Sequence, residues 1–351
     1  MCISASKEGR LTWRSSLASR LLLRPEHKVQ CRAGFIRTGR ALLRAARVAR
    51  IVLLCLPILS FPGLTQAGER LKVVATTSDL KSLVQAVGGD QVEATGIASP
   101  NQDPESFQPR PGDLAKLKNA KLVVRVGLDY DLWLDRLLKE SGNPALQRGG
   151  SGYVDASNGI ALLEVRSTAI SPTPGHAHGA GNPHYWLDPG NAEIITGSIL
   201  EGLERIDPTH AKIYGSNRAA FLSRLKEKIA NWEARLIPFR GVPIVAYHNS
   251  WPYLARRFRL KIIDFIEPKP GVPPSPVHLA ELMGKMKAQR TAVIIKEPFE
   301  PTEIPLMLER KTGARVAVLA PSVGAVPEAG DYFTLFEYNV NALVRAFGKS
   351  G

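Results

Sequence analysis

Short apolar runs alternate with segments of helical periodicity in the first half of the chain. Residues 71–77 predict a β-strand that ends at a Ser-Asp pair, a typical N-cap signal for the helical pattern over 80–87. Residues 122–126 are almost continuously apolar, as in strands buried within parallel sheets. Another strand is expected over 92–97 and another helix from Pro111. Strands that alternate with helices predict an α/β fold.

The longest uninterrupted helical pattern runs from His210 to Pro238, roughly 40 Å at 1.5 Å per residue. After it the alternation begins again. The expected strands are 243–247, 260–266 and 291–296, and the expected helices are 251–258, 275–288 and 331–347. The simplest architecture is therefore two α/β lobes with mostly parallel sheets, joined by one long bridging helix. The expected parts are a leader at 1–67, a first lobe at 68–207, the bridging helix at 208–238 and a second lobe at 239–351.

The net charge of +14 is concentrated at the start of the chain. Residues 1–50 hold twelve Lys and Arg against Glu8 and Glu26, a net charge of +10, which leaves +4 for the other residues. A basic chain can indicate nucleic-acid binding, but only if the charge lies on the folded part. The location of the charge therefore argues against a nucleic-acid partner.

The leader has the order of a secretory signal. Its basic region is followed by an uncharged apolar run at 51–59 and then by Thr65 and Ala67, which suit the two small positions before a cleavage site. We therefore place the mature start near Gly68 and expect a periplasmic protein. An uncleaved membrane anchor remains the alternative, although the apolar run is short and contains Pro57.

All three cysteines, Cys2, Cys31 and Cys55, lie in the leader. The mature protein is therefore expected to contain neither a disulfide nor a thiolate metal site. Any metal ion must be held by nitrogen and oxygen atoms. The sequence also contains neither of the glycine-rich patterns that bind nucleotide phosphates.

Three of the seven histidines fall within nine residues. His176 and His178 lie in a Gly/Ala segment, whereas His184 follows Pro183, which stiffens the backbone. Such a cluster points to metal binding. The first two histidines suit loose capture of an ion, and His184 suits a fixed site.

Other residues that could coordinate a metal ion lie where predicted strands end. Open α/β sheets bind their substrates and cofactors at these ends. His248 directly follows one strand, Glu297 follows another, and Glu105 lies in the loop after a third. With His184 they form a set suited to zinc or another first-row divalent ion. Taken singly, each has a structural alternative: His248 as a hydrogen-bonded residue, Glu105 as a solvated or helix-capping charge, and Glu297 as a brace for a turn. No His-Glu-x-x-His motif of zinc hydrolases is present.

Five short motifs in this order resemble the ZnuA-like zinc/manganese solute-binding proteins of ABC transporters. They are Asp-Pro-Glu-Ser-Phe-Gln-Pro-Arg at 103–110, Asn-Pro-His-Tyr-Trp-Leu-Asp-Pro at 182–189, Tyr-His-Asn-Ser-Trp at 247–251, Pro-Ser-Pro at 274–276 and Lys-Glu-Pro at 296–298. The similarity covers residues 71–348. It implies two α/β lobes bridged by a rigid helix, with a metal ion held in the cleft and delivered to a membrane permease.

The resemblance also assigns the ligands, with two departures. The family's usual first ligand is a histidine, and the matching residue is Glu105; the second and third ligands match His184 and His248. The fourth, an aspartate where present, matches Ala320, which cannot coordinate. Water or Glu297 could complete the shell, or Glu297 could act through a hydrogen bond. His176 and His178 resemble a shortened form of the histidine-rich loop of zinc-type members, which favours zinc over manganese.

We therefore expect a monomeric periplasmic protein that binds and releases zinc, or alternatively manganese, without chemical transformation. One rival is a family member that has lost tight metal binding and recognises another ligand or partner, favoured by Glu105 and Ala320. A second rival is a zinc-dependent hydrolase with Glu297 as its base.

Overall fold

The structure is a computed structural model that describes residues 69–164, 181–269 and 271–348. The predicted leader and cleavage site, together with His176 and His178, lie outside these residues. Among the described residues, no helix has both the length and the apolar character needed to cross a membrane.

The first half contains a parallel four-stranded sheet with the order β2-β1-β3-β4. Neighbouring residues of its strands alternate between two apolar clusters: Val73 and Ala75 face one, and Val74 faces the other. Helices therefore cover both faces, as a parallel sheet requires. The elements are β1 (Leu71–Ala75), α1 (Ser78–Gly88), β2 (Val92–Gly96), α2 (Pro111–Asn119), β3 (Leu122–Arg125), α3 (Trp133–Ser141), β4 (Tyr153–Asp155) and α4 (Ala192–Ile206).

The second half repeats this plan with a parallel sheet of the order β6-β5-β7-β8. Val245 and Ile294 face an apolar cluster shared with α7 and α8, whereas Ile244 and Ile295 face the side of α6 and α9. The elements are β5 (Pro243–Ala246), α6 (Pro252–Phe258), β6 (Lys261–Phe265), α7 (Pro276–Ala288), β7 (Val293–Lys296), α8 (Glu303–Thr312), β8 (Arg315–Val318) and α9 (Tyr332–Gly348).

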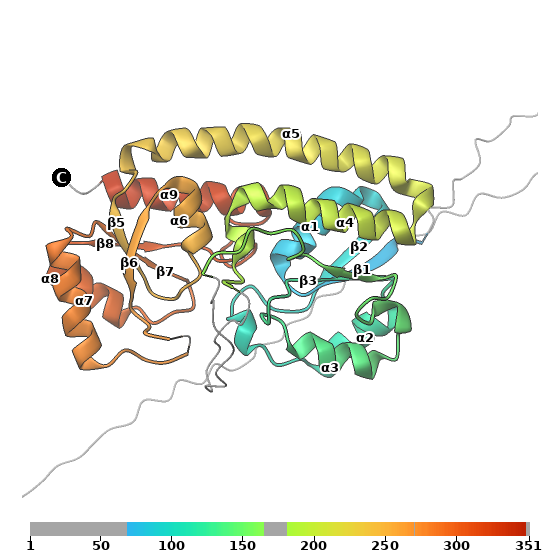
Figure 1. Ribbon diagram of the computed structural model, residues 1–351, viewed down its shortest axis with the longest axis horizontal. Helices are drawn as coiled ribbons and strands as arrows, with labels where there is room; N and C mark the ends of the chain where they lie inside the picture. Colours follow the sequence, from blue (N-terminus) through green and yellow to red (C-terminus); the bar gives the residue numbers. More distant parts are fainter. Residues whose placement is uncertain (1–68, 165–180, 270, 349–351) are drawn as a thin grey trace, which may run out of the picture. The chain divides into compact units, whose positions relative to one another are not determined.

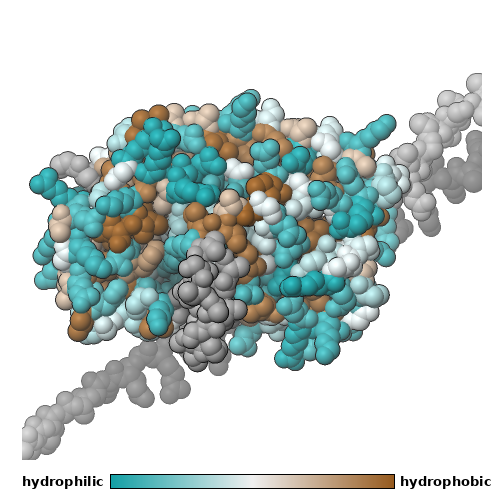
Figure 2. Space-filling view, viewed as in Figure 1, coloured by the Kyte–Doolittle hydropathy of each residue, from teal (hydrophilic) through white to brown (hydrophobic). Residues whose placement is uncertain are grey.

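Helix α5 (Ala211–Leu236) connects the two halves and is extended by 3-10 turns at Pro208–His210 and Ile237–Phe239. It packs against α1 and α4 of the first half and against α9 and α6 of the second (Figure 1). The apolar cluster on this side continues from the first sheet to the second. On the face in Figure 2, hydrophobic patches are interspersed with hydrophilic side chains, so the apolar surface is not continuous there.

The predicted fold class is confirmed, since both sheets are parallel and covered by helices. The long helical pattern from His210 to Pro238 corresponds to α5 and its flanking turns. Among the α-helices and strands of the described residues, the sequence patterns did not predict α3, α4, β4, α8 and β8.

Trp232 provides a test of how strongly α5 is anchored. Its side chain is fully buried, its indole lies 5.3 Å from the Phe336 ring of α9, and its Nε1 donates to Glu337 Oε2 at 3.0 Å. We expect Trp232→Ala to lower the free energy of unfolding by about 3–5 kcal/mol, measured by chemical denaturation, because it opens a cavity and leaves a carboxylate short of a donor. Ile213→Ala on the same helix is the control, because Ile213 is 42% exposed and its truncation should cost about 0.5 kcal/mol or less. Equal losses in the two variants would contradict this account.

Candidate metal centre

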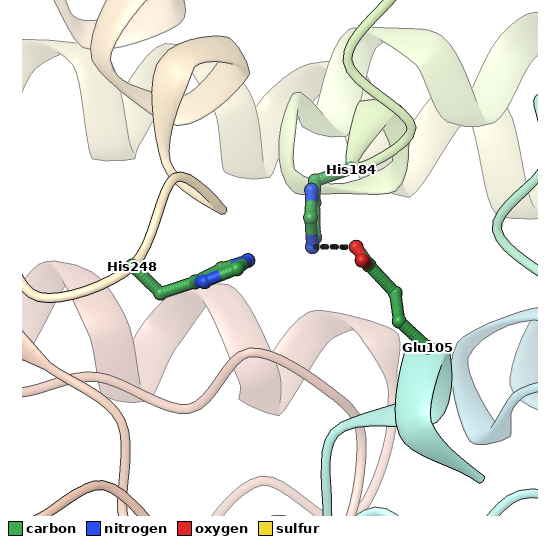
Figure 3. A group of neighbouring side chains, drawn as sticks. All are labelled: Glu105, His184 and His248. Atoms are coloured by element: carbon green, nitrogen blue, oxygen red, sulfur yellow. Dashed lines mark ion pairs between the residues drawn. The ribbon is translucent and has the colours of Figure 1, made fainter. Parts of the chain in front are cut away.

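Glu105, His184 and His248 meet in one place, although they are far apart in the sequence. One donor atom from each lies within 4.8 Å of the others, and the three side chains point toward one another (Figure 3). Glu105 Oε1 lies 3.8 Å from His184 Nε2, and the two imidazole ring centroids are 5.7 Å apart. The structure therefore groups three of the four residues predicted from the sequence as ligands.

Glu105 lies in a 3-10 turn at Pro104–Ser106, after β2. Asp103 caps this turn, because its Oδ1 accepts a hydrogen bond from the Glu105 backbone N–H at 2.9 Å. Trp133 Nε1 donates to the Pro104 carbonyl oxygen at 3.1 Å and fixes the turn against α3. The Glu105 side chain is only 3% exposed, so its carboxylate is held in the interior.

Asn182 orients His184. Its Oδ1 accepts from the His184 backbone N–H at 3.0 Å and lies 3.2 Å from His184 Nδ1. Because an amide oxygen only accepts hydrogen bonds, Nδ1 must carry the proton, and the lone pair of Nε2 is left for the site. Asn182 Nδ2 also donates to the carbonyl oxygen of Asn249, the residue after His248, at 2.9 Å. One side chain thus connects the segments of both histidines.

His248 follows β5 and is oriented by Glu267. Its Nδ1 lies 2.6 Å from Glu267 Oε2, and only 14% of its side chain is exposed. Burial acts to lower the His248 pKa, but the hydrogen bond with Glu267 and the charges of Glu297 and Glu105 outweigh it and raise the pKa to about 9. His248 is therefore protonated at neutral pH, and binding of a metal ion at Nε2 would require the loss of a proton.

Glu297 is buried and directly follows β7. It is not part of the group formed by Glu105, His184 and His248, which is called the group of three below. Its Oε1 accepts a hydrogen bond from Ser250 Oγ at 2.6 Å, and its backbone N–H donates to Glu300 Oε2. Burial raises the pKa of Glu297 to about 7; burial and the nearby Glu297 charge raise the pKa of Glu300 to about 9. This pair therefore holds at least one proton near neutral pH. Direct coordination by Glu297 stays a prediction.

The group of three adjoins a cavity of about 500 Å³. Its lining residues come from both halves of the fold and include His184, His248 and five acidic residues, which are Asp103, Glu267, Glu297, Glu300 and Glu303. No lysine or arginine occurs among the described residues that line it. Lys296 is nearby, but its Nζ is turned to the Glu297 carbonyl oxygen at 2.7 Å. The cavity therefore has the electrostatic character of a cation site.

The segment predicted to lack the fourth ligand contributes no carboxylate. Ala320 is fully buried, and its N–H and C=O are both hydrogen bonded to the Asn339 side chain, at 2.8 and 2.9 Å. Pro321 and Ser322 line the cavity in its place. The position that the resemblance assigned to a fourth ligand therefore adds no carboxylate to Glu105, His184 and His248.

The sequence reasoning missed Asn182 and Glu267 as supports of the histidines. Glu267 follows the end of β6, just as His248 follows β5 and Glu297 follows β7. The expectation that ligand-binding residues lie where the strands of an open α/β sheet end could therefore have identified it. Two other described histidines make hydrogen bonds elsewhere: His210 with Asp207, and His278 with the Phe265 carbonyl oxygen.

Comparison with known proteins places this geometry in a family. The sequence model of the family described as "Zinc-uptake complex component A periplasmic" (ZnuA) matches residues 73–346. A putative metal-binding protein of Treponema pallidum is 27% identical over 295 residues, which are 83% of this chain and 92% of the relative. The iron-binding protein YfeA of Yersinia pestis is 26% identical over 323 residues, which are 88% and 97% of the two chains.

A solved structure shares the fold as well. The solute-binding protein FpvC of Pseudomonas aeruginosa, in complex with Mn²⁺, aligns with a TM-score of 0.68 and 26% identity, over 81% of this chain and all of the other. These matches confirm the resemblance that the five motifs indicated. The chain belongs to the ZnuA family of periplasmic zinc-uptake components, the metal-binding proteins of ABC transporters.

Proposed function

We propose that this chain captures zinc in the cavity between its two sheets and delivers it to the membrane permease of an ABC transporter. The observation that carries the proposal is the meeting of Glu105, His184 and His248 with one donor atom each within 4.8 Å. Binding and release involve no chemical transformation of the cargo. We further propose that the protein acts as a monomer in the periplasm, without a nucleic-acid partner.

The donor set supports zinc, with manganese as the alternative. Two imidazoles and one carboxylate form the kind of nitrogen and oxygen set that zinc accepts, and the two imidazoles favour zinc over manganese. Zinc bonds of about 2.0–2.1 Å at tetrahedral angles place neighbouring donors about 3.3 Å apart. The donor atoms of Glu105, His184 and His248 lie within 4.8 Å of one another, so side-chain movements of about 1 Å would bring them to a shared ion.

The fourth coordination position belongs to water or to Glu297. Ala320 cannot fill it, and Glu297 lies in the same cavity wall with Oε1 bonded to Ser250 Oγ. We favour Glu297 as a hydrogen-bond partner of a metal-bound water, because its carboxylate then keeps the Ser250 contact. Membership of the ZnuA family supports the role of a metal-binding component and not that of a hydrolase.

The ligand assignment predicts the effect of removing one imidazole. Purified protein stripped with a chelator should bind one zinc per chain, and His184→Ala should weaken binding by at least about 100-fold, because two donors remain. His278→Ala is the matched control, since that histidine lies on α7 and should leave the affinity unchanged. Competition with a chromophoric chelator measures all three. If the unaltered protein binds neither zinc nor manganese saturably, the degenerate-binder alternative replaces this proposal.

The His248 pKa predicts the pH dependence of zinc affinity. Because its pKa of about 9 lies above neutral pH, zinc must displace a proton at pH 7, and affinity should fall as pH falls. Exchange of one proton lowers affinity by about tenfold per pH unit below this pKa. Titration calorimetry in buffers of different ionisation enthalpy counts the protons released. An affinity that is flat from about pH 7.5 to about 5.5 would show that the two-histidine site is wrong.

A further inference from the structure

We propose that Glu267 is a positioning residue for metal capture, which orients His248 and strengthens its bond to the ion without touching the ion itself. The inference rests on the proposed function, because it concerns the same metal site. Glu267 lies outside the group formed by Glu105, His184 and His248, and its Oε2 contacts His248 Nδ1 at 2.6 Å, so we place its effect on the imidazole.

The two sheet strands that carry these residues fix their pairing. His248 follows β5, and Glu267 follows the neighbouring β6, with which β5 pairs in parallel. The backbone N–H of Glu267 donates to the carbonyl oxygen of Tyr247, the residue before His248, at 2.9 Å. The sheet ladder therefore continues into this pair, and the carboxylate and the imidazole are brought side by side by the backbone.

Both oxygens of the Glu267 carboxylate are engaged. Oε2 lies 2.6 Å from His248 Nδ1, and Oε1 accepts from the backbone N–H of Gly271 at 2.7 Å. Gly271 has a φ of +72°, a conformation that glycine adopts without strain, and it lines the cavity. Because the carboxylate is held from both sides and only 13% exposed, it cannot turn away from the imidazole without losing a hydrogen bond.

This arrangement leaves one nitrogen of His248 for a metal ion. A carboxylate accepts hydrogen bonds, so Nδ1 carries the proton whenever the imidazole is neutral, and Nε2 presents its lone pair to the cavity. The negative charge behind the ring also increases the electron density that Nε2 offers to the ion. Carboxylate partners of this kind change metal affinity by about 10–100-fold in other sites.

The test compares Glu267→Gln and Glu267→Ala with Asp264→Asn. The glutamine keeps an acceptor for Nδ1–H but removes the charge, whereas the alanine removes both. Asp264 is the matched control, because it is an acidic residue of β6, the strand that precedes Glu267, and it pairs with Lys285 and does not line the cavity. Zinc affinity is measured by chelator competition, and the thermal midpoint of the metal-free protein reports folding.

Above about pH 9, where protons no longer compete for His248, we expect zinc affinity to fall by about tenfold in Glu267→Gln and by up to about 100-fold in Glu267→Ala, with one zinc still bound per chain and the control unchanged. In the His248→Ala background, Glu267→Ala should cause no further loss, because its effect requires the imidazole. Cobalt(II) bound to Glu267→Gln should show a shifted visible absorption spectrum, which a purely structural role would not produce.

Two results overturn the inference: zinc affinity in Glu267→Ala equal to that of the unaltered protein, or the same loss with and without His248. Glu267→Gln keeps the test valid if the alanine variant does not fold. Absence of zinc binding in the unaltered protein is a different result, which rejects the proposed function itself.

Discussion

The burial of the Tyr185–Leu187 turn between the two halves of the fold is the constraint on which the metal centre depends. Trp186 is 1% exposed, and its Nε1 donates to the Pro321 carbonyl oxygen at 3.0 Å. Tyr332 OH donates to the Trp186 carbonyl oxygen at 2.7 Å, and Tyr185 OH donates to that of Val126 at 2.8 Å. Because His184 directly precedes this turn, its ring is fixed with respect to elements of both halves. The position of one proposed ligand is thus set by the packing of the core.

The residues after the turn reinforce this connection. Asp188 is buried and forms an ion pair with Arg257 of α6 at 2.6 Å, and Arg257 also reaches Glu233 of α5 at 3.5 Å. Because the Asp188 side chain is buried, loss of Arg257 would leave this carboxylate with only the longer, 3.5 Å contact to Arg256, at a cost in stability. The ion pair therefore helps to hold α6 against the segment that follows the turn. Since His184 and His248 are held before an ion arrives, binding loses little free energy to the ordering of side chains.

The sequence predicts the parts of the fold whose apolar pattern is strong, including β1, β3, β5 and α5. It does not predict β4 and β8, because neither has the continuous apolar run that marks β3 and β5: β4 is three residues long and ends at Asp155, and β8 begins at Arg315 and is partly exposed. At the site, the strand-end rule and the motifs indicate Glu105, His184 and His248. They do not determine which way a side chain turns, so the contact of Glu297 with Ser250 could be known only from the structure.

Protons bound to Glu297, Glu300 and His248 reduce the negative charge around the cavity. This explains how so many carboxyl groups can line one cavity. Isolated buried charges are costly, so the groups shift their pKa values instead. Glu297 and Glu300 have pKa values raised to about 7 and about 9, and His248 is cationic below its pKa of about 9. A divalent ion supplies the positive charge that these protons provide in its absence. On the proposed function, uptake of a divalent ion would therefore release protons from the groups around this cavity.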